Sequence, residues 1–122
     1  MKVLLSIRPE FVNEIRTGRK KYEFRRTIFK REDIKKILIY ESAPVSKIIG
    51  EVEIKSILHD NLEDLWNKTY QQSGIDKHFF DEYFLKKEKG FAIELGNLVE
   101  FQTPKHIKDY GLKAAPQSFV YI

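Results

Sequence analysis

The arrangement of hydrophobic and polar positions in the first quarter of the chain predicts a strand, a short helix and a second strand. Residues 2–7 are almost continuously apolar, as in a buried strand. Pro9 suits the first turn of a helix, where its missing N–H costs nothing, and Gly18 is suited to ending that helix. Residues 20–26 then alternate like a half-buried strand.

The rest of the chain predicts more strands around two central helices. Asn61 and Asp76 are typical helix N-caps, because each precedes an apolar stripe with helical spacing. Further strands are predicted at residues 37–40, 46–57, 90–101 and 118–122, the third of which allows a break at Gly96-Asn97. Gly50 is expected to be a bulge or a point of close backbone contact. Between Pro104 and Gly111 we expect a short helical or irregular stretch.

This order of elements predicts an α+β fold. Strands dominate both ends and short helices fill the middle. Because five to six short strands must protect their edges, we expect a small closed or nearly closed β-barrel with short flanking α-helices. No repeat, low-complexity region or linker interrupts the pattern, so residues 1–122 are expected to form a single domain.

Composition narrows the class of protein. The 122 residues are 42% hydrophobic and 33% charged, which fits a globular protein rather than a disordered chain. The absence of cysteine excludes disulfides and thiolate metal sites. The chain does not begin like a signal peptide, and no apolar run approaches membrane length. We therefore expect a cytoplasmic protein without a membrane partner.

Positive charge is concentrated in one segment. Residues 16–31 hold eight basic residues and one acid, Glu23, so the segment is +7. The whole chain is +4, which leaves −3 for everything else. Such a concentration is typical of a site for a polyanion or a phosphorylated ligand.

Within this segment, the pattern Gly18-x-Lys20-x-x-Glu23-x-Arg25 combines a turn with charges of both signs. On an alternating strand, Lys21, Glu23 and Arg25 would share one face. Lys20 and Arg25 would then engage a phosphate or base, and Glu23 would accept from a base amine or tune the lysine. The alternative is an exposed strand with ordinary ion pairs, but such pairs are worth only about 0–1 kcal/mol and do not explain the crowding of like charge.

The same pattern resembles the signature of the ASCH domain (activating signal cointegrator homology). The resemblance implies a PUA-like β-barrel whose cleft, lined by the motif, binds RNA or modified nucleosides. It spans essentially the whole chain, and the other matching segments are Leu5-Ser6-Ile7-Arg8-Pro9-Glu10, Tyr40-x-Ser42-x-Pro44, Ser73-Gly74-Ile75 and Ala115-Pro116-Gln117-Ser118-Phe119.

From charge and resemblance together we predict a set of residues that bind RNA or a nucleotide-like ligand. Arg19 and Arg26 are included for their positive potential, and Arg8 and Ser42 because the resemblance places their segments near the cleft. The predicted set is Arg8, Arg19, Lys20, Glu23, Arg25, Arg26 and Ser42.

Three functions remain open at this point: RNA binding in RNA metabolism or transcription-related regulation, an enzyme on the same scaffold, and a protein-interaction module of a transcriptional coregulator. In an enzyme, the catalytic residues would be Lys20 and Glu23. A ribonuclease would use them as acid and base, with Arg25 holding charge. Related amidohydrolases that deacetylate a modified cytidine use a lysine, a threonine and a glutamate. Lys20 matches, but Glu23 replaces the threonine and no carboxylate occurs in residues 71–73.

The remaining polar and aromatic residues indicate no cofactor. The three histidines, His59, His78 and His106, have no metal-ligand spacing, so no metal site is predicted. One of Tyr22, Tyr40 and Tyr121 could stack on a base, although core packing suits each as well. Helical spacing predicts that the aromatic residues Trp66, Tyr70, Phe79, Phe80, Tyr83 and Phe84 pack the helices onto the barrel.

Overall fold

The computed structural model describes all residues from Met1 to Ile122 and contains one six-stranded sheet. The strand order is β2-β5-β4-β3-β1-β6; β1 and β3 are parallel and every other pair is antiparallel. The strands are β1 (Val3–Ile7), β2 (Tyr22–Arg25), β3 (Lys36–Glu41), β4 (Lys47–Asn61), β5 (Lys89–Lys105) and β6 (Phe119–Tyr121).

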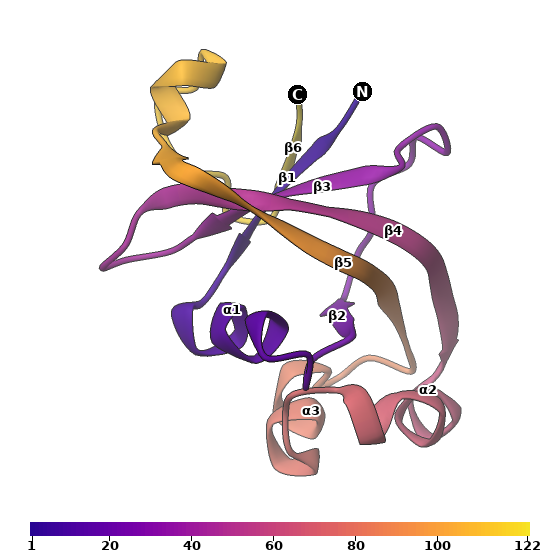
Figure 1. The fold of residues 1–122 in the computed structure, drawn as a ribbon. Helices are drawn as coiled ribbons and strands as arrows, with labels where there is room; N and C mark the ends of the chain where they lie inside the picture. Colours follow the sequence, from indigo (N-terminus) through magenta and orange to yellow (C-terminus); the bar gives the residue numbers. More distant parts are fainter.

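The two longest strands give the sheet its curl. β4 and β5 pair along most of their length and bend together around the molecule (Figure 1). Their register shifts at three places, and such bulges increase bending and twist. Gly50 lies at one shift, where a Cβ atom would stand 2.6 Å from the carbonyl oxygen of Val99. The predicted close-contact glycine is therefore confirmed, whereas β5 runs without the break allowed for at Gly96-Asn97.

Three short helices gather at the end of the molecule where β4 and β5 bend (Figure 1). Both predicted N-caps are confirmed: the Asn61 side chain accepts from the Asp64 N–H at 2.9 Å, and Asp76 accepts from the Phe79 N–H at 2.8 Å. The helices are α1 (Pro9–Arg16), α2 (Leu62–Thr69) and α3 (Lys77–Tyr83), with 3₁₀ turns η1 (Tyr70–Gln72) and η2 (Ile107–Tyr110). At eight residues or fewer, every α-helix is far too short to cross a bilayer.

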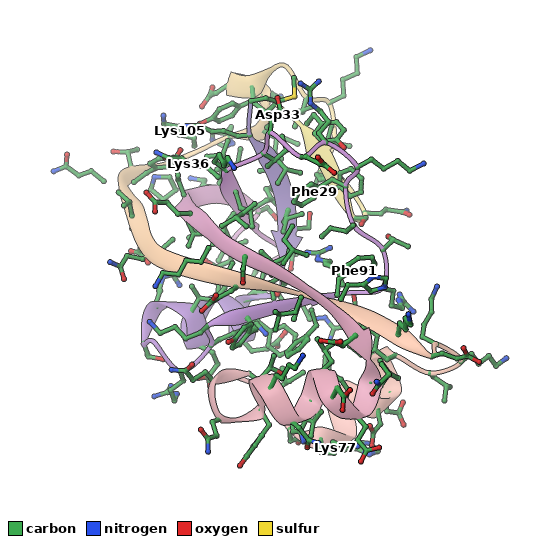
Figure 2. All side chains as sticks on the ribbon, turned by 90° about the vertical axis from the view of Figure 1, so that its right-hand side faces the viewer. Phe29, Asp33, Lys36, Lys77, Phe91 and Lys105 are labelled. Carbon is green, nitrogen blue, oxygen red and sulfur yellow. The ribbon has the colours of Figure 1, made fainter.

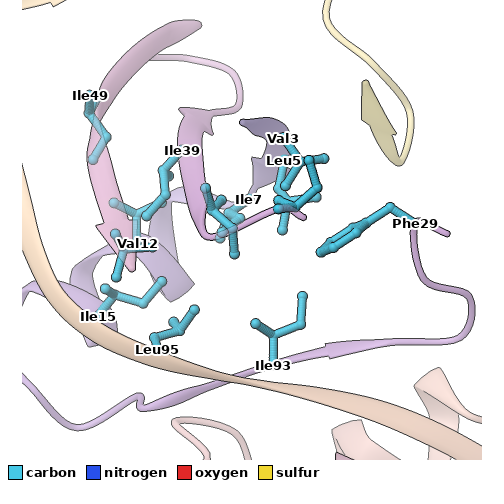
Figure 3. Packing of buried hydrophobic residues seen from close by; sticks show 13 residues of the cluster. Val3, Leu5, Ile7, Val12, Ile15, Phe29, Ile39, Ile49, Ile93 and Leu95 are labelled. Atoms are coloured by element: carbon cyan, nitrogen blue, oxygen red, sulfur yellow. The ribbon is translucent and has the colours of Figure 1, made fainter. Parts of the chain in front are cut away.

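The buried core residues form three clusters, two of which border the cleft described below. The main cluster fills the curl of the sheet with side chains from β1, β3, α1 and β5 (Figure 3). A smaller, aromatic cluster packs Phe24 of β2 against Leu65, Phe80 and Phe84 of the helical end. Lys77, at the start of α3, marks that end in Figure 2, opposite Lys36 at the start of β3.

The sheet curls into a half-barrel whose two edge strands, β2 and β6, are not paired with each other. The α+β fold with short flanking helices is therefore as expected, and the barrel is a half-barrel that strand pairing does not close. The open side of the half-barrel lies between β2 at one edge and the β1–β6 pair at the other. This gap is where the charged motif comes to lie.

Candidate ligand-binding cleft

A cleft of about 650 Å³ opens between the end of β1, α1, β2, α3 and the segment before β6. Aromatic rings from α1 and α3 form part of its wall, and hydroxyl and amide groups also line it. Five cations and a single carboxylate line it, so its charged residues sum to +4: Arg8, Lys20, Glu23, Arg25, Arg26 and Lys87.

Lys20 lies on the floor of the cleft and is almost completely buried, with a side chain only 2% exposed. Its Nζ donates to the carbonyl oxygen of Ser73 at 2.9 Å, and the two residues also form an isolated β-bridge. Gly74 lies against the lysine stem, where an added Cβ would be 2.5 Å from the Lys20 Cβ. Gly74 also has a φ of +68°, which few other residues adopt. The glycine is required both by its backbone angle and by the contact with Lys20.

The surroundings of Lys20 disfavour its charge. Burial lowers the pKa of the Lys20 ammonium, Glu23 partly opposes that change, and Arg25 lowers the pKa further. The ammonium lies 5.4 Å and 5.0 Å from the ring centroids of Phe11 and Phe24, and 3.9 Å from Glu23 Oε1. Only one of its three N–H groups has a hydrogen-bond acceptor in the protein, the Ser73 carbonyl. Lys20 therefore keeps donor capacity for a ligand.

Arg25 fastens the open side of the half-barrel. Its Nε and Nη2 contact Glu23 Oε2 at 3.1 Å and 2.9 Å. The same guanidinium donates to the carbonyl oxygens of Ser6, at the end of β1, and Ser118, just before β6, at 3.1 Å and 3.4 Å. A side chain thus joins β2 to β1 and to the β6 segment where no strand pairing does. Most of its donors are already used within the protein.

The mouth of the cleft carries cations of a different kind. Arg8 caps the start of α1, and its guanidinium carbon lies 5.7 Å from the Phe79 ring centroid. Arg26 follows β2 directly, 4.9 Å from the Tyr83 ring centroid. Both arginines are exposed, whereas Tyr83 is half-buried, and burial raises the pKa of its hydroxyl. The mouth therefore combines exposed charge with fixed aromatic rings.

The family model for the ASCH domain matches residues 5–105. The chain belongs to the ASCH domain family. Its curled sheet agrees with a solved relative: the crystal structure of ASCH from Zymomonas mobilis superposes with a TM-score of 0.89 at 26% identity, covering 99% of this chain and 87% of that one.

Curated relatives of this ASCH domain include proteins of different kinds. An ASCH domain-containing ribonuclease from Zymomonas mobilis is 30% identical over 92 residues, which are 75% of this chain and 62% of that protein. A large ribosomal subunit protein uL22 from Ureaplasma parvum is 28% identical over 87 residues, or 71% of this chain and 28% of that protein. The chain thus spans less than two thirds of the length of either relative.

The ASCH cleft brings together five of the seven residues predicted to bind a ligand, and two lie elsewhere. The Arg19 side chain bonds Glu14 and faces a shallow groove on the other side of the Ser73–Gly74 segment. Ser42 lies in the turn after β3 and donates its backbone N–H to Ile7. The five that line the cleft are Arg8, Lys20, Glu23, Arg25 and Arg26.

The predicted half-buried strand differs from the observed one. β2 begins only at Tyr22, and both Glu23 and Phe24 are buried, because one face meets the cleft floor and the other meets α3. Lys20 precedes the strand yet is buried as well. Alternation detected the strand but not that structure covers both of its faces.

Sequence reasoning missed the aromatic wall of the cleft. Phe79 and Tyr83 were predicted only to pack α3 onto the barrel, yet both line the cleft together with Phe11. Their i, i+4 spacing after the Asp76 cap was the available signal for a shared face. None of Tyr22, Tyr40 and Tyr121, the predicted stacking candidates, lines the cleft.

The histidines stay apart in the fold. His59 stacks on Phe91 with ring centroids 4.1 Å apart, His78 is exposed on α3, and His106 caps η2. No group of three or more histidine or carboxylate side chains is close enough together to hold a metal ion.

Proposed function

We propose that this ASCH domain binds RNA or a nucleotide-like ligand in the basic cleft. The observation that carries the proposal is the pairing of Lys20 and Glu23 on the floor of a cleft rich in cations and aromatic rings. Its volume of about 650 Å³ falls within the range of roughly 300–1,000 Å³ usual for small-ligand sites. A single unstacked nucleotide is a ligand of this size and charge.

The floor offers the two kinds of hydrogen bond that a base edge requires. Lys20 Nζ is a donor with unused N–H groups, and Glu23 Oε1, 3.9 Å away, is an acceptor. Arg25 holds the other oxygen of Glu23, which fixes the carboxylate in place. An unpaired base with neighbouring donor and acceptor groups complements such a pair, and RNA-binding modules commonly read splayed bases this way.

A ribonuclease is the second candidate, favoured by two observations. One relative is named an ASCH domain-containing ribonuclease. In addition, the lowered pKa of Lys20 raises the share of neutral amine that can act as a general base on a ribose hydroxyl. In this role the cations around the cleft would stabilise charge developing on the phosphate.

One experiment separates the two candidates and tests the first. Labelled single-stranded RNA is titrated with the protein at several salt concentrations while the length of the RNA is followed on gels. We expect Lys20→Met to weaken binding about ten-fold, since it removes a buried donor to the ligand. Lys21→Met is the matched control, because Lys21 has the same charge but lies outside the cleft.

The outcomes are distinct. Intact RNA whose affinity depends on Lys20 and falls steeply with salt supports a binding domain. Cleavage that is lost in Lys20→Met but kept in Lys21→Met supports a ribonuclease. Binding that is insensitive both to salt and to Lys20→Met contradicts the proposal.

A further inference from the structure

We propose that Arg8 and Arg26 form a phosphate subsite at the mouth of the cleft, and that Phe79 and Tyr83 are platforms that hold these arginines rather than surfaces that stack a base. The inference rests on the proposed function, because it assigns the phosphate of the bound nucleotide to a place of its own. The ligand class is a nucleoside monophosphate or the equivalent phosphate within a strand.

The cations of the cleft differ in whether they already have hydrogen-bond or ion-pair partners within the protein. Lys20 donates to Ser73, and Arg25 contacts Glu23 and two backbone carbonyls. By contrast, the side chains of Arg8, Arg26 and Lys87 have neither an ion pair nor a hydrogen bond within the protein. The free positive charge of the cleft is therefore at its mouth, not on its floor.

Two of these free cations are held in position by neighbouring rings. Phe79 and Tyr83 are one helical turn apart on α3, with ring planes 9° apart and centroids 6.3 Å apart. Arg8 lies over the first ring and Arg26 over the second, so α3 carries both guanidinium groups. A cation–π contact of this kind is attractive and reduces the motion of a long side chain.

The two arginines reach these rings from different elements, Arg8 from the start of α1 and Arg26 from the end of β2, and both line the same cleft. Planar guanidinium forks match the geometry of phosphate oxygens, and two held forks complement one phosphate better than mobile lysines do. Because arginines cover Phe79 and Tyr83, the base is directed past them towards Lys20 and Glu23. The ligand would thus lie with its phosphate at the mouth and its base on the floor.

Calorimetric titration with inorganic phosphate, a nucleoside and the corresponding monophosphate tests the subsite. We expect the wild type to bind the monophosphate about ten-fold more tightly than the nucleoside. Arg8→Gln and Arg26→Gln should each remove most of that preference and leave nucleoside affinity nearly unchanged. Arg19→Gln is the control for charge, since it removes one arginine outside the cleft. An equal loss in Arg19→Gln would overturn the subsite in favour of a general field effect.

A second variant tests the role of the rings. If Phe79 is a platform, Phe79→Leu should weaken monophosphate binding several-fold and spare the nucleoside. Equal weakening of both ligands would mean that the ring stacks a base, and the proposal would be wrong. A preference for monophosphate that survives Arg8→Gln combined with Arg26→Gln overturns the subsite but not the nucleotide site. If no nucleoside or nucleotide binds, the proposed function fails, whereas inorganic phosphate binding lost in both glutamine variants still supports the subsite.

Discussion

Six of the eight cations of residues 16–31 form two groups that differ in surroundings rather than in sequence. An outer group, Arg16, Arg19 and Arg31, points away from the cleft, and each member has a carboxylate partner. An inner group, Lys20, Arg25 and Arg26, lines the cleft with Glu23 as its one acid. Neighbours in sequence such as Arg19 and Lys20 belong to different groups.

The outer group shows why charge counted along the chain overstates the charge at the site. Arg16 contacts Glu41 and Glu100, and Arg31 contacts Asp33. These acids all lie outside residues 16–31, and they neutralise the charge of the two arginines. Water screens the exposed Arg31–Asp33 pair, which contributes little to stability, whereas one partner of Arg16, Glu41, is buried. The Arg31–Asp33 pair also lies at the end of the molecule opposite α3, as the labels of Asp33 and Lys77 show in Figure 2. The net charge of +7 counted over residues 16–31 is thus not the charge that lines the cleft.

The inner group should respond most strongly to loss of its single acid. Glu23→Gln leaves Lys20 and Arg25 buried without a compensating charge, and breaking a buried ionic pair from one side costs about 3–5 kcal/mol. We expect a fall of this size in the free energy of unfolding, measured by urea denaturation. Asp33→Asn, which removes the acid of an outer pair, should leave the urea midpoint nearly unchanged. Similar effects in both variants would contradict the division into two groups.

Two glycines give a second contrast. Gly18 and Gly74 both have positive φ, at +80° and +68°, but only Gly74 is in contact with the inner group, through Lys20. Gly18→Ala should cost about 1 kcal/mol, since its Cβ would meet open space and only backbone strain applies. Gly74→Ala should cost about 2–3 kcal/mol, because strain is added to a clash with Lys20.

The ligand affinity of the two glycine variants sharpens this contrast. Gly74→Ala must displace Lys20, so we expect RNA binding to fall together with stability, whereas Gly18→Ala should retain it. Thermal unfolding and RNA titration measure the two effects separately. Unchanged RNA affinity in a folded Gly74→Ala protein would show that the position of Lys20 does not matter for binding.

What the sequence predicted well depends on local interactions. The caps at Asn61 and Asp76 and the start of α1 at Pro9 are set within a few residues, so spacing and residue type sufficed. The division of the basic segment is not local. Lys20 is buried because Ser73 and Gly74, more than fifty positions later, cover it, and Arg25 points inward because the ends of β1 and the β6 segment supply its acceptors.

Ser42 was predicted to belong to the site only because its segment resembles the ASCH pattern, and the structure shows the limit of that reasoning. Its stretch follows β3 and its backbone bonds the end of β1, so it does lie near elements of the site. The side chain nevertheless does not line the cleft, because the chain turns away after Glu41. A resemblance between segments can place a segment near the site, but the orientation of a single side chain is known only from the three-dimensional structure.

Lys20 itself is expected to make stability depend on pH. Burial places its folded-state pKa below the unfolded value of 10.5, so the unfolded chain binds the proton more tightly in the interval between them. The wild type should therefore gain stability as pH rises through the folded-state pKa towards 10.5. Below the folded-state pKa, the free energy of unfolding carries the full cost of burying the charged ammonium. Lys20→Met removes this cost, while Glu23 keeps Arg25 as its partner.

We thus expect Lys20→Met to be as stable as the wild type or more stable at pH 7, with the difference shrinking as pH approaches 10.5. Urea denaturation at a series of pH values measures it. A variant that is several kcal/mol less stable at pH 7, as expected for Glu23→Gln, would mean that the ammonium is needed to hold the inner group together.

The smallest expected effect belongs to the outer group. Hydrogen bonds from Arg31 lower the pKa of Asp33 from 3.8 to about 2, so any stability from this pair is present above pH 3.8 and is lost as pH falls through about 2. Carboxyl NMR titration should show a pKa below 3.8 for Asp33 in the wild type and a return towards 3.8 in Arg31→Gln. By linkage the variant also loses stability at pH 7, but we expect this loss in the free energy of unfolding to be small, because water screens the exposed pair. A clear loss of stability in Arg31→Gln would show that exposure alone does not separate the two groups.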